Sequence, residues 1–239
     1  MLLELKGVSK RFGAVVAADA IDLNVAEGVA LGIIGANGAG KSSLFNLITG
    51  VLRPDAGTVA LDGRDITHLP ARQRCHAGIG RSFQIPRPFE SLSVFENLLV
   101  AAQFGSRERG SVAHCADVLE RTGLAAKANS VAGGLTLLDR KRLELARALA
   151  TRPRLLLLDE IAGGLTEAEC AELVALIRAL HAEGTTIIWI EHIVHALFSV
   201  VSELIVLEFG RKIAEGAPQE VMTRPEVRRS YLGIDEAAA

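Results

Sequence analysis

The sequence predicts an α/β protein with a mainly parallel β-sheet, an antiparallel β layer before it and an inserted α-helical subdomain. Short apolar runs alternate with amphipathic stretches of helical length, a pattern typical of parallel strands covered on both faces. The stretch at residues 1–6 and two short strands around Asp19 would form the antiparallel layer. Residues 85–150 are mostly helical in pattern and would form the subdomain.

An apolar run at residues 29–34 is the first expected parallel strand, and a glycine-rich loop follows it. The loop has the pattern G-x-x-x-x-G-K-[ST] and opens a helix, as in a P-loop NTPase core. Glycines let backbone N–H groups turn around phosphate oxygens, and the helix N-terminus adds further donors. We expect Lys41 to be exposed and to reach the β- and γ-phosphates, and Ser42 to join a Mg²⁺ shell. The predicted nucleotide-binding residues here are Gly35, Ala36, Asn37, Gly38, Ala39, Gly40, Lys41, Ser42 and Ser43.

The middle of the chain continues with short elements before it becomes helical. Pro86 and Pro88 exclude a helix or central strand after Gln84, so a loop is expected there. Ser93 and Glu96 have the spacing of a capping box, which predicts the start of a helix. The other expected elements are a strand at 57–61, a short helix at 70–77, a strand at 78–83, a polar connection at 105–110 and a helix at 112–122.

The last third of the chain alternates strands and helices again. The apolar strand at 154–158 ends in Asp159-Glu160, and the strand at 185–190 ends in Glu191-His192. The remaining expected elements are helices at 136–150, 167–182 and 193–201, a hairpin around 210–211, and a tail of short helices from 218, interrupted at Pro225.

Polar side chains that follow these strands would meet at one edge of the sheet, where ligands of open α/β sheets bind. Asp159 would bind Mg²⁺, and Glu160 would orient or deprotonate a water. Gln84 would sense Mg²⁺ or that water, and His192 would hydrogen-bond the γ-phosphate. Phe12 would stack on an adenine ring. The structural alternatives are acids and a histidine that only cap strands, and a phenylalanine that only ends one.

Composition limits the function classes. The chain has 239 residues and a net charge of −2, so no general nucleic-acid surface is expected. Its three cysteines are far apart and suit a reducing compartment. No signal peptide is expected, and no uncharged apolar run approaches the roughly 18–20 residues that span a bilayer. We therefore expect a cytosolic chain that docks on a membrane partner.

The order of these motifs resembles the nucleotide-binding subunit of ABC transporters over essentially the whole chain. Three segments are more narrowly similar to the ATPases of branched-chain amino-acid importers: GIGRSFQIPRPFESLSVFENLLVAA, RKRLELARALATRPRLLLLDE and EGAPQEVMTRPEVRRSYLG. The resemblance implies ATP and Mg²⁺ as cofactors, a second ABC ATPase in a hetero-dimer, two permease subunits and a solute-binding protein. It implies a peripheral protein on the cytoplasmic face of the inner membrane, soluble when isolated. Related importers carry urea, amides and aromatic acids, so the solute stays open.

One segment departs from the family pattern. The signature LSGGQ, which contacts the γ-phosphate bound to the partner subunit, is replaced by Leu135, Thr136, Leu137, Leu138 and Asp139. Leucines stand where glycines let backbone approach phosphate, and an acid replaces an amide. Gly133-Gly134 is a second possible register, and an alternative is that the leucines point inward and their amides still reach phosphate. The resemblance thus predicts a weaker site opposite this segment.

The resemblance implies one ABC ATPase domain over residues 1–239. Its parts would be a nucleotide-binding core with the antiparallel layer (1–84 and 151–217), the helical subdomain (85–150) and a C-terminal tail (218–239). Two other function classes remain: a soluble ABC protein that uses ATP as a switch, and a nucleotide-binding module without hydrolysis. The first usually carries tandem cassettes or long coiled-coil insertions, which this chain lacks. Glu160 argues against the second.

Overall fold

The computed structural model describes residues 1–106 and 111–232, and the expected connection at 105–110 lies mostly outside them. The chain divides into two compact units. The first unit comprises residues 1–70 and 188–239, and the second comprises 71–187. The subdomain boundaries expected from the sequence stay a prediction.

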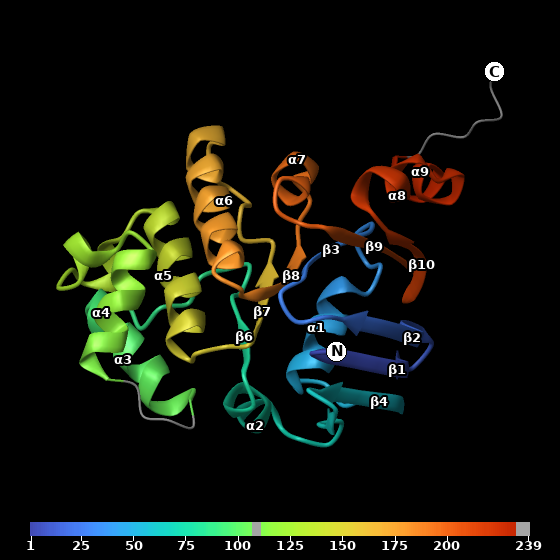
Figure 1. Cartoon of the computed structure of the whole chain (residues 1–239), viewed down its shortest axis with the longest axis horizontal. Helices are drawn as coiled ribbons and strands as arrows, with labels where there is room; N and C mark the ends of the chain where they lie inside the picture. The colour runs from blue at the N-terminus through green and yellow to red at the C-terminus, as the bar shows by residue number, and fades with distance from the viewer. Residues whose placement is uncertain (107–110, 233–239) are drawn as a thin grey trace. The chain divides into compact units, whose positions relative to one another are not determined.

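The first unit begins with an antiparallel sheet, shown in blue and teal in Figure 1. Its strand order is β2-β1-β4-β5, and every neighbouring pair is antiparallel. At the start of β1, the buried residues Leu3 and Leu5 alternate with the more exposed Glu4 and Lys6, so one face of the sheet covers the core. The strands are β1 (Leu3–Phe12), β2 (Val15–Val25), β4 (Ala56–Leu61) and β5 (Arg64–Asp65).

The expectation of two short strands around Asp19 is wrong, because β2 is one continuous strand with a bulge. Ala20 has a positive φ of 49° at this bulge, where the pairing register with β1 shifts. The Ala20 N–H donates to the Ser9 hydroxyl at 2.9 Å, which satisfies a backbone donor that regular pairing would otherwise use.

The remaining strands of the first unit form the mainly parallel core sheet in the order β10-β9-β3-β8. β3 is parallel to β9, and β9 is antiparallel to β10. All five residues of β3 are buried, as expected for a strand covered on both faces. The elements are β3 (Ala30–Ile34), β8 (Thr186–Ile190, with residues in both units), β9 (Glu203–Glu208), β10 (Arg211–Gly216), α1 (Lys41–Thr49), α7 (Val194–Phe198), α8 (Pro218–Thr223) and α9 (Pro225–Leu232).

The second unit continues the strand order as β8-β7-β6, with β6 parallel to β7, and contains the helical part of the chain. Helices α3, α4 and α5 pack on one another, as Figure 1 shows in green and yellow. The expected capping box of Ser93 and Glu96 is present at the start of α3. The elements are α2 (Ala71–His76), β6 (Ile79–Arg81), α3 (Val94–Phe104), α4 (Val112–Arg121), the 3₁₀ turns η1 (Ala125–Lys127) and η2 (Ala132–Gly134), α5 (Leu137–Ala150), β7 (Leu155–Asp159) and α6 (Glu167–Ala182).

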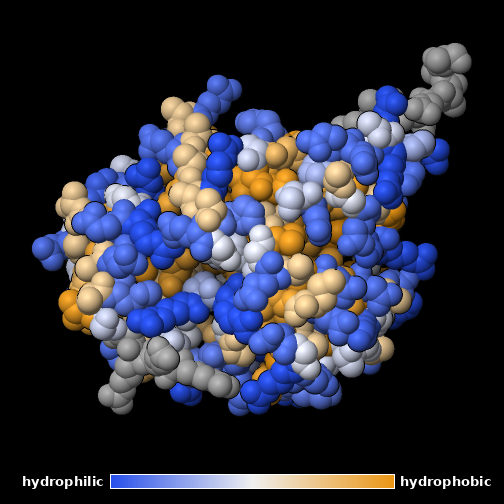
Figure 2. All heavy atoms as spheres, in the orientation of Figure 1, coloured by the Kyte–Doolittle hydropathy of each residue, from blue (hydrophilic) through white to orange (hydrophobic). Residues whose placement is uncertain are grey.

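On the face in Figure 2, hydrophilic side chains are interspersed with smaller hydrophobic patches. Within residues 1–106 and 111–232, no helix has both the length and the apolar character needed to cross a membrane.

Candidate nucleotide-binding and hydrolysis site

The phosphate loop lies in the first unit, between the buried end of β3 and the start of α1. Gly40 precedes the first residue of α1 and has a φ of 102°, a left-handed conformation that favours glycine. A Cβ atom at Gly40 would lie 2.4 Å from the Ala17 carbonyl oxygen, so no side chain fits. The motif therefore forms a strand–loop–helix unit, and the N-terminus of such a helix has backbone donors that can bind an anion.

Lys41 is buried, with only 6% of its surface exposed, so the expectation of an exposed lysine is wrong. Its Nζ donates to the carbonyl oxygens of Gly35 at 2.7 Å and of Ala36 at 3.1 Å. The aliphatic part of the side chain is enclosed, while the ammonium group lies across the loop and bonds its carbonyls. Ser42 is exposed and Ser43 is half-buried, so both hydroxyls lie near the surface.

A hollow of about 600 Å³ adjoins the loop within the first unit. Its lining includes Gly38 of the loop, Arg11 and Val16 of the β1–β2 hairpin, and Phe209. Phe12, the expected adenine-stacking residue, ends β1 next to Arg11 and is 47% exposed. Lys10 Nζ lies 5.6 Å from the centre of its ring. The ring is thus accessible for stacking, although it is not part of the lining of the hollow.

The second unit brings three expected site residues together. Asp159 is the buried last residue of β7, and Glu160 follows it with a positive φ of 46°. Gln84 Nε2 donates to Glu160 Oε2 at 2.6 Å. A left-handed backbone at a non-glycine residue costs on the order of 1 kcal/mol and occurs often at functional sites. This conformation aims the carboxylate of Glu160 toward Gln84.

Two residues of this cluster were missed by sequence reasoning. Arg81, on β6, pairs with Asp159 Oδ2 at 2.7 Å, and Lys141, on α5, donates to the Gln84 carbonyl at 3.3 Å. The signal for Arg81 was a charged residue inside a strand whose neighbour ends in two acids. No comparable signal existed for Lys141, because it looks like one more basic residue on an amphipathic helix.

His192 lies in the first unit directly after β8, as the sequence predicts. Its side chain is exposed, and its backbone N–H donates to Glu191 Oε1 at 3.0 Å. Glu191 is buried and fixes the turn by which the chain leaves the strand. An exposed imidazole at the end of a buried strand suits the expected contact with phosphate, which stays a prediction.

The altered signature forms the start of α5. Thr136 is the N-cap residue, and its hydroxyl oxygen accepts from the Asp139 N–H. Leu138 is buried, whereas Leu137 is 44% exposed, so only one of the two leucines points inward. Gly133-Gly134, the other possible register of the signature, belongs to η2 and lies just before α5.

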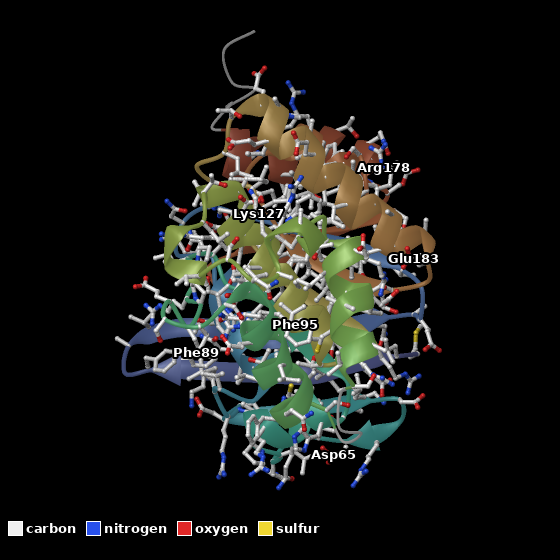
Figure 3. The ribbon with its side chains drawn as sticks, turned by 90° about the vertical axis from the view of Figure 1, so that its left-hand side faces the viewer. Asp65, Phe89, Phe95, Lys127, Arg178 and Glu183 are labelled. Atoms are coloured by element: carbon white, nitrogen blue, oxygen red, sulfur yellow. The ribbon has the colours of Figure 1, made fainter. Side chains whose placement is uncertain are left out.

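Asp139, the acid that replaces the amide of the family signature, forms an ion pair within its own subunit. It is 4% exposed and pairs with Lys127, which Figure 3 labels among the helices of the second unit. The Thr136 hydroxyl also donates to Asp139 Oδ2 at 2.8 Å. The carboxylate is therefore compensated within its own subunit, and it engages the hydroxyl that Thr136 would offer to phosphate.

The donor set fits ATP and magnesium. Among residues 1–106 and 111–232, no group of three or more His, Cys, Asp or Glu side chains could hold a metal ion. Mg²⁺ keeps several waters and is usually bound by one or two protein oxygens together with substrate phosphates. The Ser42 hydroxyl in the first unit and the Asp159 carboxylate in the second are oxygen ligands of this kind.

Comparison with known proteins identifies the family to which the chain belongs. Residues 18–163 match the family model described as ABC transporter, and the chain belongs to this family of ATP-binding cassettes. It is an ATPase subunit of an ABC importer. Residues 211–237 match the model described as branched-chain amino acid ATP-binding cassette transporter, which places the chain in that branch.

Individual relatives agree with this assignment. The high-affinity branched-chain amino acid transport ATP-binding protein BraF of Pseudomonas aeruginosa is 36% identical, with 97% of this chain and 98% of BraF covered. The corresponding LivG of Escherichia coli is 35% identical at the same coverage. A crystal structure of a nucleotide-free ATP-binding cassette from an ABC transporter has a TM-score of 0.88 and 31% identity, covering 98% of this chain and 99% of that one. These relatives cover nearly the full length of the chain.

Proposed function

We propose that this subunit hydrolyses Mg·ATP to drive the import of branched-chain amino acids or related small solutes. Its partners would be a second ABC ATPase, two membrane-embedded permease subunits and a solute-binding protein, with the subunit bound to the cytoplasmic face of the inner membrane. The observation that carries the proposal is the phosphate loop, in which Gly40 has a left-handed backbone at the start of α1 and the Lys41 ammonium group lies at the loop carbonyls. The similarity to BraF and LivG supports the choice of solute.

Each site residue has a role in this proposal. Lys41 and the loop amides would stabilise the negative charge on the phosphates, since in-line attack by water needs preorganised donors. Asp159 and Ser42 would hold Mg²⁺, which when bound neutralises charge on the phosphate oxygens. Glu160 would orient the attacking water and accept its proton, with Gln84 positioning the carboxylate through its 2.6 Å bond.

The isolated subunit is expected to be largely monomeric and to hydrolyse ATP slowly. The reason is that a phosphate loop of one cassette works with the signature of another. Analytical ultracentrifugation and an ATPase assay at low micromolar concentration test this expectation. A stable homodimer with high activity would contradict it.

The two ATP sites of a hetero-dimer are expected to be unequal. The partner's phosphate loop would face Thr136 and Leu137 of this chain, where the hydroxyl already bonds Asp139 and a leucine side chain is 44% exposed. Glycine serves in such a segment because it adds no bulk beside phosphate. Most turnover should therefore occur at the phosphate loop of this chain.

The asymmetry is measured as loss of ATPase activity in the assembled transporter. The phosphate-loop lysine is replaced by alanine in one subunit at a time. The variant in this chain should lose more ATPase activity, and Leu137→Gly with Leu138→Gly should raise activity at the partner's loop. Equal losses from the two lysine variants, after correction for coupling between sites, would show that the sites are equivalent.

A further inference from the structure

We propose that Arg81 is a positioning residue that acts as an internal counter-ion of Asp159 and competes with a divalent cation for its carboxylate. The inference rests on the proposed role of Asp159 in holding Mg²⁺. It adds a residue that no sequence motif singled out, and it predicts that the dependence of nucleotide affinity on magnesium is set in part by this arginine.

The contact between the two side chains is close and largely shielded from water. Arg81 Nη2 lies 2.7 Å from Asp159 Oδ2, and the two side chains are 10% and 8% exposed. The guanidinium carbon also lies 4.9 Å from the centre of the Phe83 ring, which supports the planar group from one side. A buried, charge-assisted bond of this kind is stronger than an exposed one, because water does not screen it.

The backbone explains why these residues meet. β6 and β7 are parallel, and Arg81 pairs in register with Leu157, two residues before Asp159. Three residues after Arg81, Gln84 donates to Glu160 at 2.6 Å. One short segment, residues 81–84, therefore contacts both acids at the end of β7, Asp159 and Glu160.

Charge explains why the arginine would compete with a metal. A single carboxylate beside a guanidinium is already neutralised, and a second cation on the same group meets repulsion from the first. Binding of a divalent cation at Asp159 would then weaken the bond to Arg81. The arginine keeps Asp159 oriented when no cation is present, at the cost of weaker cation binding.

Arg81→Met tests this directly in the full-length subunit. A fluorescent, non-hydrolysable ATP analogue is titrated with Mg²⁺ and with EDTA, and the ratio of the two dissociation constants gives the magnesium-dependent gain in affinity. We expect this gain to be about tenfold larger in Arg81→Met than in the wild type, because no charge-assisted bond has to be broken. Without nucleotide, the melting temperature should fall by several degrees, since Asp159 is left without this partner.

Arg147→Met is the matched control in the same unit. Arg147 pairs with the buried Glu144 at 2.9 Å and lies 5.2 Å from the centre of the Phe89 ring, so its surroundings repeat those of Arg81 away from Asp159. This variant should also melt at a lower temperature, with an unchanged magnesium-dependent gain. If Arg81→Met does not fold, Arg81→Lys carries the test, because a lysine keeps the charge but lacks the planar fork; a gain about threefold above the wild type is expected.

The outcomes separate the two proposals. A gain in Arg81→Met that equals or falls below that of the wild type would overturn the role of Arg81 as a competitor. If magnesium does not change the affinity of the wild type at all, the proposed metal role of Asp159 itself fails. Asp159→Asn provides a check, because it should remove most of the gain whichever residue stands at position 81.

Discussion

Glu160→Gln is expected to slow ATP hydrolysis by the assembled transporter by on the order of 10²-fold or more, while ATP still binds. Glutamine has the same shape as glutamate and keeps an acceptor oxygen for the bond that Gln84 now donates at 2.6 Å. The left-handed backbone at this position is also kept. The change therefore removes the basic group and little else, and the loss falls on the proton transfer to the general base.

Hydrolysis is measured by phosphate release from the complex, and binding is measured with a fluorescent ATP analogue. Glu172→Gln is a suitable control, because Glu172 is an acid of the same unit that pairs with Arg142 at 2.6 Å and has no proposed role. It should leave both quantities unchanged. Hydrolysis at the wild-type rate in Glu160→Gln would mean that another group activates the water.

Lys41→Ala is expected to weaken ATP binding by about 10- to 100-fold, the range for loss of one strong charge-assisted contact. The ammonium group bonds the Gly35 and Ala36 carbonyls, so it already lies at the loop that would hold the phosphates. Because these bonds are also lost, the free energy of unfolding should fall by about 1–3 kcal/mol. The fold should survive, since the helix core does not depend on the ammonium group.

Titration with a fluorescent ATP analogue gives the affinity, and circular dichroism gives the stability. Lys212→Ala is the matched control in the same unit, because Lys212 forms an ion pair with Glu215 on β10. It should not change ATP affinity. Unchanged ATP affinity in a folded Lys41→Ala protein would contradict the proposed role of the phosphate loop in binding ATP.

Much of the fold was predictable because its signals are local. Wholly apolar runs ending in acids predicted β7, and a capping box predicted the start of α3. The continuous strand β2 was not predictable, because its bulge depends on a hydrogen bond from the Ala20 N–H to the Ser9 hydroxyl on another strand, β1. The position of such a bulge depends on how two strands pair, and a single sequence does not reveal that pairing.

The placement of the candidate site residues was predictable where chemistry requires one residue type at one position. The glycines and lysine of the loop and the two acids at the end of β7 are of this kind, and the structure places them at the ends of buried strands. The compensation of Asp139 by Lys127 was not predictable, because the partner lies on a separate 3₁₀ turn. The burial of Lys41 was missed because the motif indicates what the ammonium group contacts and not how its stem packs.

Transport by the reconstituted complex tests the central claim most directly. The subunit is assembled with its partner ATPase, permeases and solute-binding protein in liposomes, and uptake of radiolabelled leucine is measured together with ATP hydrolysis. ATP-dependent uptake is expected with the wild-type chain, and Glu160→Gln is expected to cause a strong loss of both uptake and hydrolysis. Leucine uptake that proceeds at the wild-type rate with Glu160→Gln, or hydrolysis that is never accompanied by uptake of a small solute, would contradict the claim.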